Sequence, residues 1–324
     1  MKKYLTPLLL LLLAACTEKV DLQSRSDYHE YLSVEAVLTD RKEDPQRITL
    51  SRTISYFHQE AQPMVSGASV RVNDVVFSEK EPGIYEAPEG YACEAGVNYR
   101  LRIRLSEGDE YEAEASMPEN GFRLDAVDYA FAGGKTMDSD SLWTLAVWGY
   151  EKEISSYFLL THAVNGLYPP FSMAVVADDK FFNNADVAGF PITGLLQSEM
   201  LRKRYGDCFK YLEAGDVLTQ EVWTLDKGFY DFLVALTMNS VSIPLFTPQP
   251  ANVPTNLRGD QVLGYFAVCS VSRASVTVDD PFRPYFKRMF PLLQEFFQQD
   301  LAVAGDDDVV VADGIRQEVT GVFR

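Results

Sequence analysis

The sequence predicts a mainly β protein, with an N-terminal antiparallel β-sandwich followed by a second β-rich domain that carries one well-defined helix. Two observations support this prediction. From Tyr31 onward, short segments of alternating apolar and polar residues recur about every ten residues, with Pro, Gly, Asn or Asp between them. No segment before residue 118 has the spacing of an amphipathic helix. Short strands at regular intervals are typical of antiparallel sandwiches.

The chain begins with a segment that has the pattern of a bacterial lipoprotein signal, MKKYLTPLLLLLLAAC. Two lysines precede an apolar run that ends in Ala14-Ala15-Cys16. This ending resembles the lipobox, which implies that Cys16 takes a diacylglycerol and its freed amine a third acyl chain. We therefore expect a signal peptide over 1–15 and a mature chain from Cys16 that contacts the membrane through its lipid. An ordinary secretory signal is the alternative.

Charge and cysteine content narrow the class further. Loss of the signal removes two lysines and takes the net charge from −18 to −20, which argues against nucleic acid and against direct adsorption to anionic lipid. Beyond Cys16 the chain has Cys93, Cys208 and Cys269, an odd number. Cys208 and Cys269 are the candidates for a disulfide in an oxidising compartment. Buried free cysteines are the commoner alternative.

Residues 16–28 are polar and predict a flexible tether ahead of a first domain over 29–118. Acidic residues close to Cys16 resemble surface-export signals, so either face of the outer membrane stays open. Within the domain, Arg100, Arg102 and Arg104 alternate with apolar residues, and Glu110, Glu112 and Glu114 do the same. A turn at Gly108 would place Arg104 opposite Glu110 and so fix the register. A solvated ion-pair ladder is the main interpretation, and an ion or phosphate site is the alternative.

Part of the first domain resembles a known kind of sandwich. The segments Val65–Val72, Gly83–Tyr85 and Gly96–Leu101 are similar to the immunoglobulin-like folds called prealbumin-like or carboxypeptidase-regulatory. The resemblance covers about fifty residues. It implies a spacer, adhesion or docking module.

The second domain is expected over 119–278. Aromatic-rich strands are predicted at 122–131, 142–150 and 156–164, and they are followed by irregular stretches with unusual aromatic content. Tyr168, Phe171, Phe181 and Phe182 are candidate ligand or partner contacts in these loops. The alternative is that the rings fold back to fill the sandwich.

One helix is predicted near 226–239. Asp226 can cap its first turn, and its apolar stripe is formed by Phe229, Phe232, Leu233, Leu236 and Met238. A proline-rich loop over 248–257 follows, then closing strands at 262–269 and 271–278. Residues 279–324 form a C-terminal tail with a broken helix predicted from Tyr285 to Leu301.

The order of several segments resembles one family. The lipobox, Tyr31–Thr39, Thr49–Thr53, Pro63–Val70 and the Asn252-Val-Pro-Thr-Asn256 phrase followed by Gly264-Tyr265-Phe266 are similar to the Bacteroidota lipoproteins called domain of unknown function 4249. The resemblance implies an accessory role beside TonB-dependent outer-membrane receptors, with no catalytic residue to carry over. The loop that holds Asn252 and Asn256 is expected to supply further contacts.

No pattern in the chain predicts catalysis. The three histidines, His29, His58 and His162, lack metal-ligand spacing, and there is no nucleophile elbow, phosphate-binding loop or dinucleotide fingerprint. We expect no catalytic residue, no metal and no cofactor. The sequence favours a non-enzymatic, lipid-anchored outer-membrane protein that assists nutrient uptake and whose ligand is unknown. An adhesion or envelope-structural protein, and after it a surface hydrolase, are the alternatives.

Overall fold

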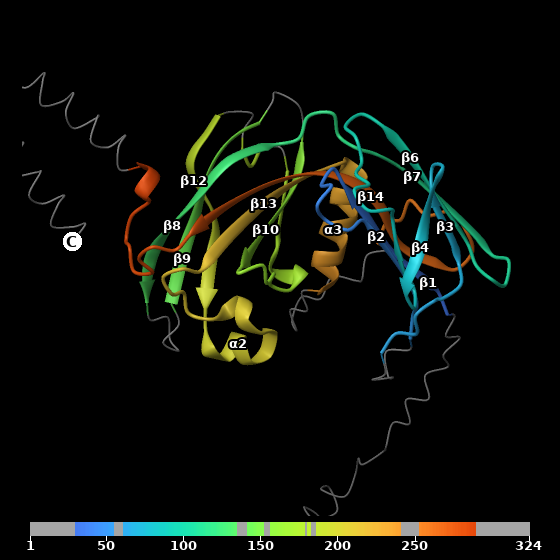
Figure 1. The fold of residues 1–324 in the computed structure, drawn as a ribbon, viewed down its shortest axis with the longest axis horizontal. Coiled ribbons are helices and arrows are strands. Elements are labelled where there is room, and N and C mark those ends of the chain that lie inside the picture. Colours follow the sequence, from blue (N-terminus) through green and yellow to red (C-terminus); the bar gives the residue numbers. More distant parts are fainter. Residues whose placement is uncertain are drawn as a thin grey trace, which may run out of the picture.

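A computed structural model describes residues 30–54, 61–134, 141–151, 156–178, 180–182, 186–240 and 253–289. Two β bodies lie side by side in it, linked by one long strand (Figure 1). The mainly β, sandwich-like class predicted from the sequence is confirmed. Cys16, the predicted tether and Asn252 lie outside the described residues.

One sheet has 11 strands in the order β11-β10-β13-β14-β1-β2-β5-β4-β3-β6-β7, and a second has the order β12-β9-β8. The strands of the larger sheet are β1 (Leu32–Thr39), β2 (Arg47–Arg52), β3 (Ser69–Val72), β4 (Val75–Glu81), β5 (Ile84–Glu86), β6 (Asn98–Arg104), β7 (Glu110–Ser116), β10 (Tyr157–Val164), β11 (Val175–Ala177), β13 (Val217–Leu225) and β14 (Val262–Thr277). Those of the smaller sheet are β8 (Arg123–Gly134), β9 (Ser141–Tyr150) and β12 (Asp186–Gln197).

The first body encloses one hydrophobic core. Alternate residues of β1, β2, β3 and β6 point into it, as their burial patterns show, and Phe77 and Tyr85 fill its centre. Phe266 and Val268 of β14 belong to the same core. The first body is therefore completed by a strand from far along the chain.

The second body packs the smaller sheet against β10, β13 and the second half of β14. Trp143, Tyr129 and Phe158 are fully buried between the two layers. The layers are also cross-linked, since the backbone N–H of Phe122 donates to Thr224 Oγ1 at 2.9 Å. This is the sandwich arrangement expected when each sheet has one apolar face.

β14 joins the two bodies. Its first half pairs with β1 in parallel, from Leu32 opposite Val262 to Thr39 opposite Cys269, and its second half pairs antiparallel with β13. The sequence predicts two closing strands at 262–269 and 271–278, but the structure has one continuous strand. The predicted domain boundary near residue 118 stays a prediction. β14 lies after this boundary in the sequence, but its residues pack in both bodies.

Gly264 is required where β14 meets β1. Its φ is +108°, a conformation that residues with a Cβ rarely adopt, and an added Cβ would collide with the carbonyl oxygen of Val34. A larger residue there would separate β14 from β1.

The predicted helix is confirmed as α3 (Lys227–Ser240), and Asp226 caps it by accepting a hydrogen bond from the N–H of Phe229 at 2.9 Å. Its predicted stripe is buried only in part, because Leu236 and Met238 are exposed. The sequence did not predict α2 (Glu199–Tyr205). The short 3-10 turns are η2 (Phe171–Met173), η3 (Asp207–Phe209) and η4 (Lys287–Met289). In the described part of the chain, no helix has the length and apolarity needed to cross a bilayer.

The start of the predicted C-terminal tail packs against β8. Arg283 is buried there, and its guanidinium lies 2.6 Å from Asp128 and 4.2 Å from the centre of the Tyr129 ring. The N–H of Phe131 donates to the carbonyl of Arg283, so this segment continues the hydrogen bonding of the β8 edge. Of the broken helix predicted from Tyr285, only η4 falls within the described residues.

The three described cysteines, Cys93, Cys208 and Cys269, are buried and free. The candidate pair Cys208–Cys269 therefore does not form a disulfide in this structure. The alternative of buried single cysteines holds for all three.

Candidate functional site

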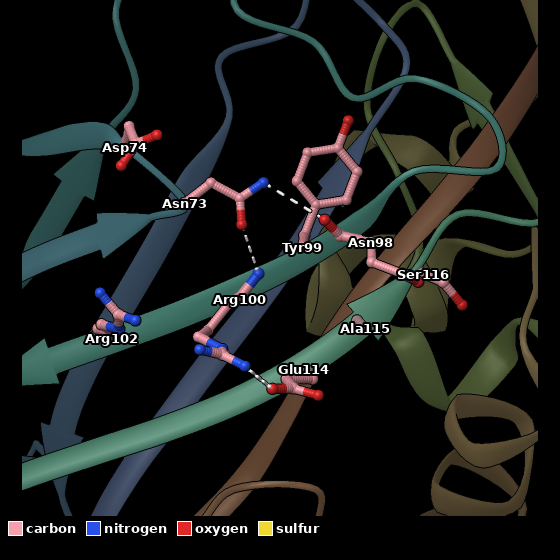
Figure 2. A pocket seen from close by; sticks show the side chains of 9 residues that line it. All are labelled: Asn73, Asp74, Asn98, Tyr99, Arg100, Arg102, Glu114, Ala115 and Ser116. Carbon is pink, nitrogen blue, oxygen red and sulfur yellow. Dashed lines mark hydrogen bonds and ion pairs between the residues drawn. The ribbon is translucent and has the colours of Figure 1, made fainter.

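A polar pocket of about 730 Å³ opens on the outer face of the first body (Figure 2). It lies beside the β3–β4 turn and the β6–β7 hairpin. Its lining consists of Asn73, Asp74, Asn98, Tyr99, Arg100, Arg102, Glu114, Ala115 and Ser116.

The polar groups of this pocket are largely engaged with one another. Asn73 adopts a left-handed φ of 51° at the turn, and its Oδ1 accepts the backbone N–H of Arg100 at 2.8 Å. A guanidinium nitrogen of Arg100 lies 2.6 Å from Glu114 (Figure 2). These contacts fasten the β3–β4 turn to β6 and β6 to β7.

The predicted hairpin register is confirmed. Arg104 faces Glu110, Arg102 faces Glu112 and Arg100 faces Glu114, and the last two distances along the ladder are 3.4 Å for Arg102–Glu112 and 3.5 Å for Arg104–Glu110. All three pairs are exposed, so each contributes well under about 1 kcal/mol. The ladder interpretation accounts for both arginines of the pocket, and we do not place the candidate function there.

A second surface, on the second body, is apolar. Five large apolar side chains within nine residues of one another are 38–48% exposed: Leu167, Tyr168, Phe171, Met173 and Val175. We call this surface the apolar edge. It runs from the end of β10 through η2 into β11, which is the end strand of the larger sheet and pairs only with β10 among the described residues.

A buried carboxylate holds Tyr168 in place. Glu221 in β13 is 2% exposed at its side chain, and it accepts hydrogen bonds from the Tyr168 hydroxyl at 2.7 Å and from the Trp223 indole at 2.9 Å. Arg273 of β14 donates to the same carboxylate at 2.6 Å and also pairs with Asp44 at 2.8 Å. The polar end of Tyr168 is thus fixed from below, while its ring stays at the surface.

The Tyr168 hydroxyl stays protonated in this setting. Burial, reinforced by the hydrogen bond to the negative Glu221, raises the pKa of Tyr168 to about 12. The hydroxyl is therefore a permanent donor at physiological pH. The arrangement orients the Tyr168 side chain.

The structure divides the predicted contact residues. Tyr168 and Phe171 are exposed on the apolar edge, but Phe182 is buried, with ring centres 4.4 Å from Phe122 and 5.1 Å from Phe158. Phe181 is partly buried against Phe182. For these last two rings, the alternative of filling the sandwich describes what the structure shows.

Asn256 acts as a cross-link within the fold. Its amide nitrogen donates to the carbonyls of Phe266 and Glu114, at 2.8 and 3.0 Å, and its oxygen accepts the N–H of Phe266 at 3.0 Å. The side chain thereby ties the loop before β14 to both β14 and β7. Asn252, the other predicted contact residue of this loop, lies outside the described residues.

Sequence reasoning missed Glu221 and Arg273. Both lie on strands that are otherwise uncharged, and a charged residue in the middle of such a strand was the available signal. Burial of a charge is costly unless it is paired. A glutamate in one buried strand therefore predicts a cation in a neighbouring strand, and the reverse.

No metal site emerges from the described residues, which contain no group of three or more His, Cys, Asp and Glu side chains placed to hold an ion. His162 of β10 faces the interior of the second body opposite Gln220. Burial lowers the pKa of His162 to about 4, so it is neutral at physiological pH.

Comparison with known proteins gives one result. The model of a family described as "Domain of unknown function (DUF4249)" matches residues 17–275. No curated protein matches the chain, and no solved structure does. The match runs through both β bodies and ends within β14.

Proposed function

The chain belongs to the DUF4249 family, and from this premise we propose that it is a non-enzymatic, lipid-anchored outer-membrane protein that assists a TonB-dependent receptor in nutrient uptake. The observation that carries the proposal is the apolar edge: exposed apolar side chains concentrated beside an end strand of the larger sheet. Surfaces of this kind are typical of protein–protein contacts.

The anchor is supported by the sequence. The basic start, the short apolar run and Ala14-Ala15-Cys16 have the order of a lipoprotein signal. Two or more acyl chains make membrane attachment stable, where one chain gives only marginal binding.

The apolar edge suits a partner because it is ordered before binding. Tyr168 is held by Glu221, and the backbone of η2 is closed by bonds from Met173 to Pro170 and from Ala174 to Phe171. A preorganised surface loses less conformational entropy on binding than a loose loop. The end strand β11 also offers backbone groups to an added strand.

The lipid anchor favours binding by raising the effective concentration of the protein near its receptor. Both partners held in one membrane meet without a search through bulk, so a modest contact area is enough for a stable complex. In this mechanism the protein acts by its position and contains no reacting group.

The anchor is tested by labelling cells with an alkyne analogue of palmitate. The wild-type chain should carry the label and Cys16→Ala should lose it. Equal labelling of both, or of neither, would show that Cys16 is not the acylated residue.

The contact is tested with a photo-crosslinking amino acid placed at Phe171. We expect a crosslink to an outer-membrane receptor and none from a matched probe at Val76, which is similarly exposed on β4 of the first body. Crosslinks from position 171 only to envelope polymers or to host surfaces would favour the adhesion role instead. Equal crosslinking from both positions would argue against a specific contact at the apolar edge.

A further inference from the structure

α2 and η3 form a projection from the second body. None of the seven residues of α2 is buried, and the segment is held to the body at its base by Cys208, Phe209 and Leu212. Figure 1 shows α2 standing out at the lower edge of the molecule. A helix that contributes nothing to the core and stays exposed needs another explanation.

The outer face of α2 combines one strongly exposed apolar side chain with cations. Met200, Lys203 and Arg204 are spaced i, i+3 and i+4, so they share a face of the helix. Met200 is 63% exposed, and Tyr205 follows at the end of the helix. The pattern is unusual in a chain of net charge −18.

The cations of this face are only weakly engaged within the chain. Arg204 has no ion pair among the described residues, and its guanidinium lies 5.1 Å from the centre of the Tyr205 ring. Lys203 is 75% exposed and lies 3.7 Å from Glu199, a solvated contact of little energy. Arg202 differs, because it is engaged with Asp207 at 2.8 Å.

The chemistry of this face fits the surface of an anionic bilayer. Lysine and arginine attract lipid phosphates, tyrosine favours the headgroup level, and an exposed methionine can enter the acyl boundary. The negative charge of the whole chain opposes general adsorption, so only a local cationic face could make this contact.

The start of β1 can lie close enough to the membrane for α2 to contact it. In Figure 1, β1 begins on the lower side of the first body, and α2 stands out on the lower side of the second body. Cys16 lies fourteen positions before Glu30, and even fully extended this stretch would reach only about 50 Å. An anchor at Cys16 therefore keeps the start of β1 within about 50 Å of the membrane.

We propose that the α2 face, Met200, Lys203, Arg204 and Tyr205, docks on the anionic headgroups of the membrane that holds the lipid anchor and so sets the orientation of the body. The proposal deepens the proposed function and rests on its anchor. It places the membrane on one edge of the molecule and leaves the apolar edge to a protein partner.

The test uses the full chain with Met200→Cys carrying an environment-sensitive fluorophore, since the three described native cysteines are buried. Vesicles are phosphatidylcholine alone or with about a quarter phosphatidylglycerol. We expect a blue shift and shielding from an aqueous quencher only with phosphatidylglycerol. The matched probe Val76→Cys on the β3–β4 hairpin should stay in water.

Charge reversal on α2 tests whether its cations are needed, and charge reversal elsewhere is the control. Lys203→Glu with Arg204→Glu should abolish the shielding, while Arg71→Glu, an exposed cation on the β3–β4 hairpin, should leave it intact. In the unacylated Cys16→Ala chain, replacing Lys203 and Arg204 by Ala should weaken phosphatidylglycerol binding about 25-fold, since each contributes a factor of about five.

The outcomes separate the two proposals. If the wild-type chain is not acylated but Cys16→Ala still shows the charge-dependent shielding, the anchor fails and the docking face stands. A chain that pellets with vesicles through its lipid while position 200 stays in water would overturn the docking face. Equal shielding in phosphatidylcholine alone, or shielding without vesicles through a second copy, would overturn it as well.

Discussion

Replacing Tyr168 by Phe tests whether Glu221 holds the apolar edge. The substitution keeps the ring and removes one donor from a carboxylate that is 2% exposed. A hydrogen bond to a charged group contributes about 1.5–3 kcal/mol to the free energy of unfolding, and Glu221 keeps its bonds from Trp223 and Arg273. We therefore expect a loss of about 2 kcal/mol, which lowers Tm by roughly 4–8 °C.

The assay is urea denaturation of the wild type, Tyr168→Phe, Glu221→Gln and the double variant. Because the two residues share one bond, the double variant should be more stable than the sum of the single effects predicts, by about 1 kcal/mol or more. Tyr150→Phe, a similarly exposed tyrosine on β9, is the control and should change stability by less than about 0.5 kcal/mol. Strict additivity of Tyr168→Phe and Glu221→Gln would refute the reasoning.

Three further predictions concern the two bodies and their junction. The pKa of His162 is lowered to about 4, so between about pH 6.5 and 4 the unfolded chain binds a proton that the folded chain does not. Stability should fall by roughly 3 kcal/mol as pH drops through this window, and His162→Gln should remove that dependence in denaturation curves measured at pH 7 and 4. Gly264→Ala should lower the unfolding free energy by at least about 2 kcal/mol, because the new Cβ collides with β1; unchanged thermal unfolding would contradict the β1–β14 pairing. Arg283→Ala leaves the buried Asp128 without its cation and should cost about 3 kcal/mol, while adding Asp128→Asn should restore part of the loss.

Local pattern predicted much of the fold. The β6–β7 register follows from the sequence because the apolar residues fix one face and the charges fix the other. The helix α3 follows from Asp226 and the spacing of Phe229 and Leu233. Both signals are complete within about twenty residues of chain.

Other features depend on partners that are distant in the sequence. β12 escaped prediction because Gly189 and Pro191 interrupt the alternation, and the structure accommodates both with register shifts in an end strand. Apart from Gly264, no local sequence pattern indicates the parallel pairing of β1 with β14. In the candidate site, Tyr168 is exposed and Phe182 is buried. The difference depends on how each loop packs against the two sheets, and the spacing of residues in the sequence does not predict that packing.

The most direct test of the account is purification of the lipidated protein from cells in mild detergent, with the composition of the complex read by mass spectrometry. The account predicts a TonB-dependent receptor in a fixed ratio with the wild type, lost on Phe171→Ser and retained with Val76→Ser. A wild-type protein that purifies alone, or a receptor retained equally by both variants, would contradict the claim that the apolar edge binds a receptor.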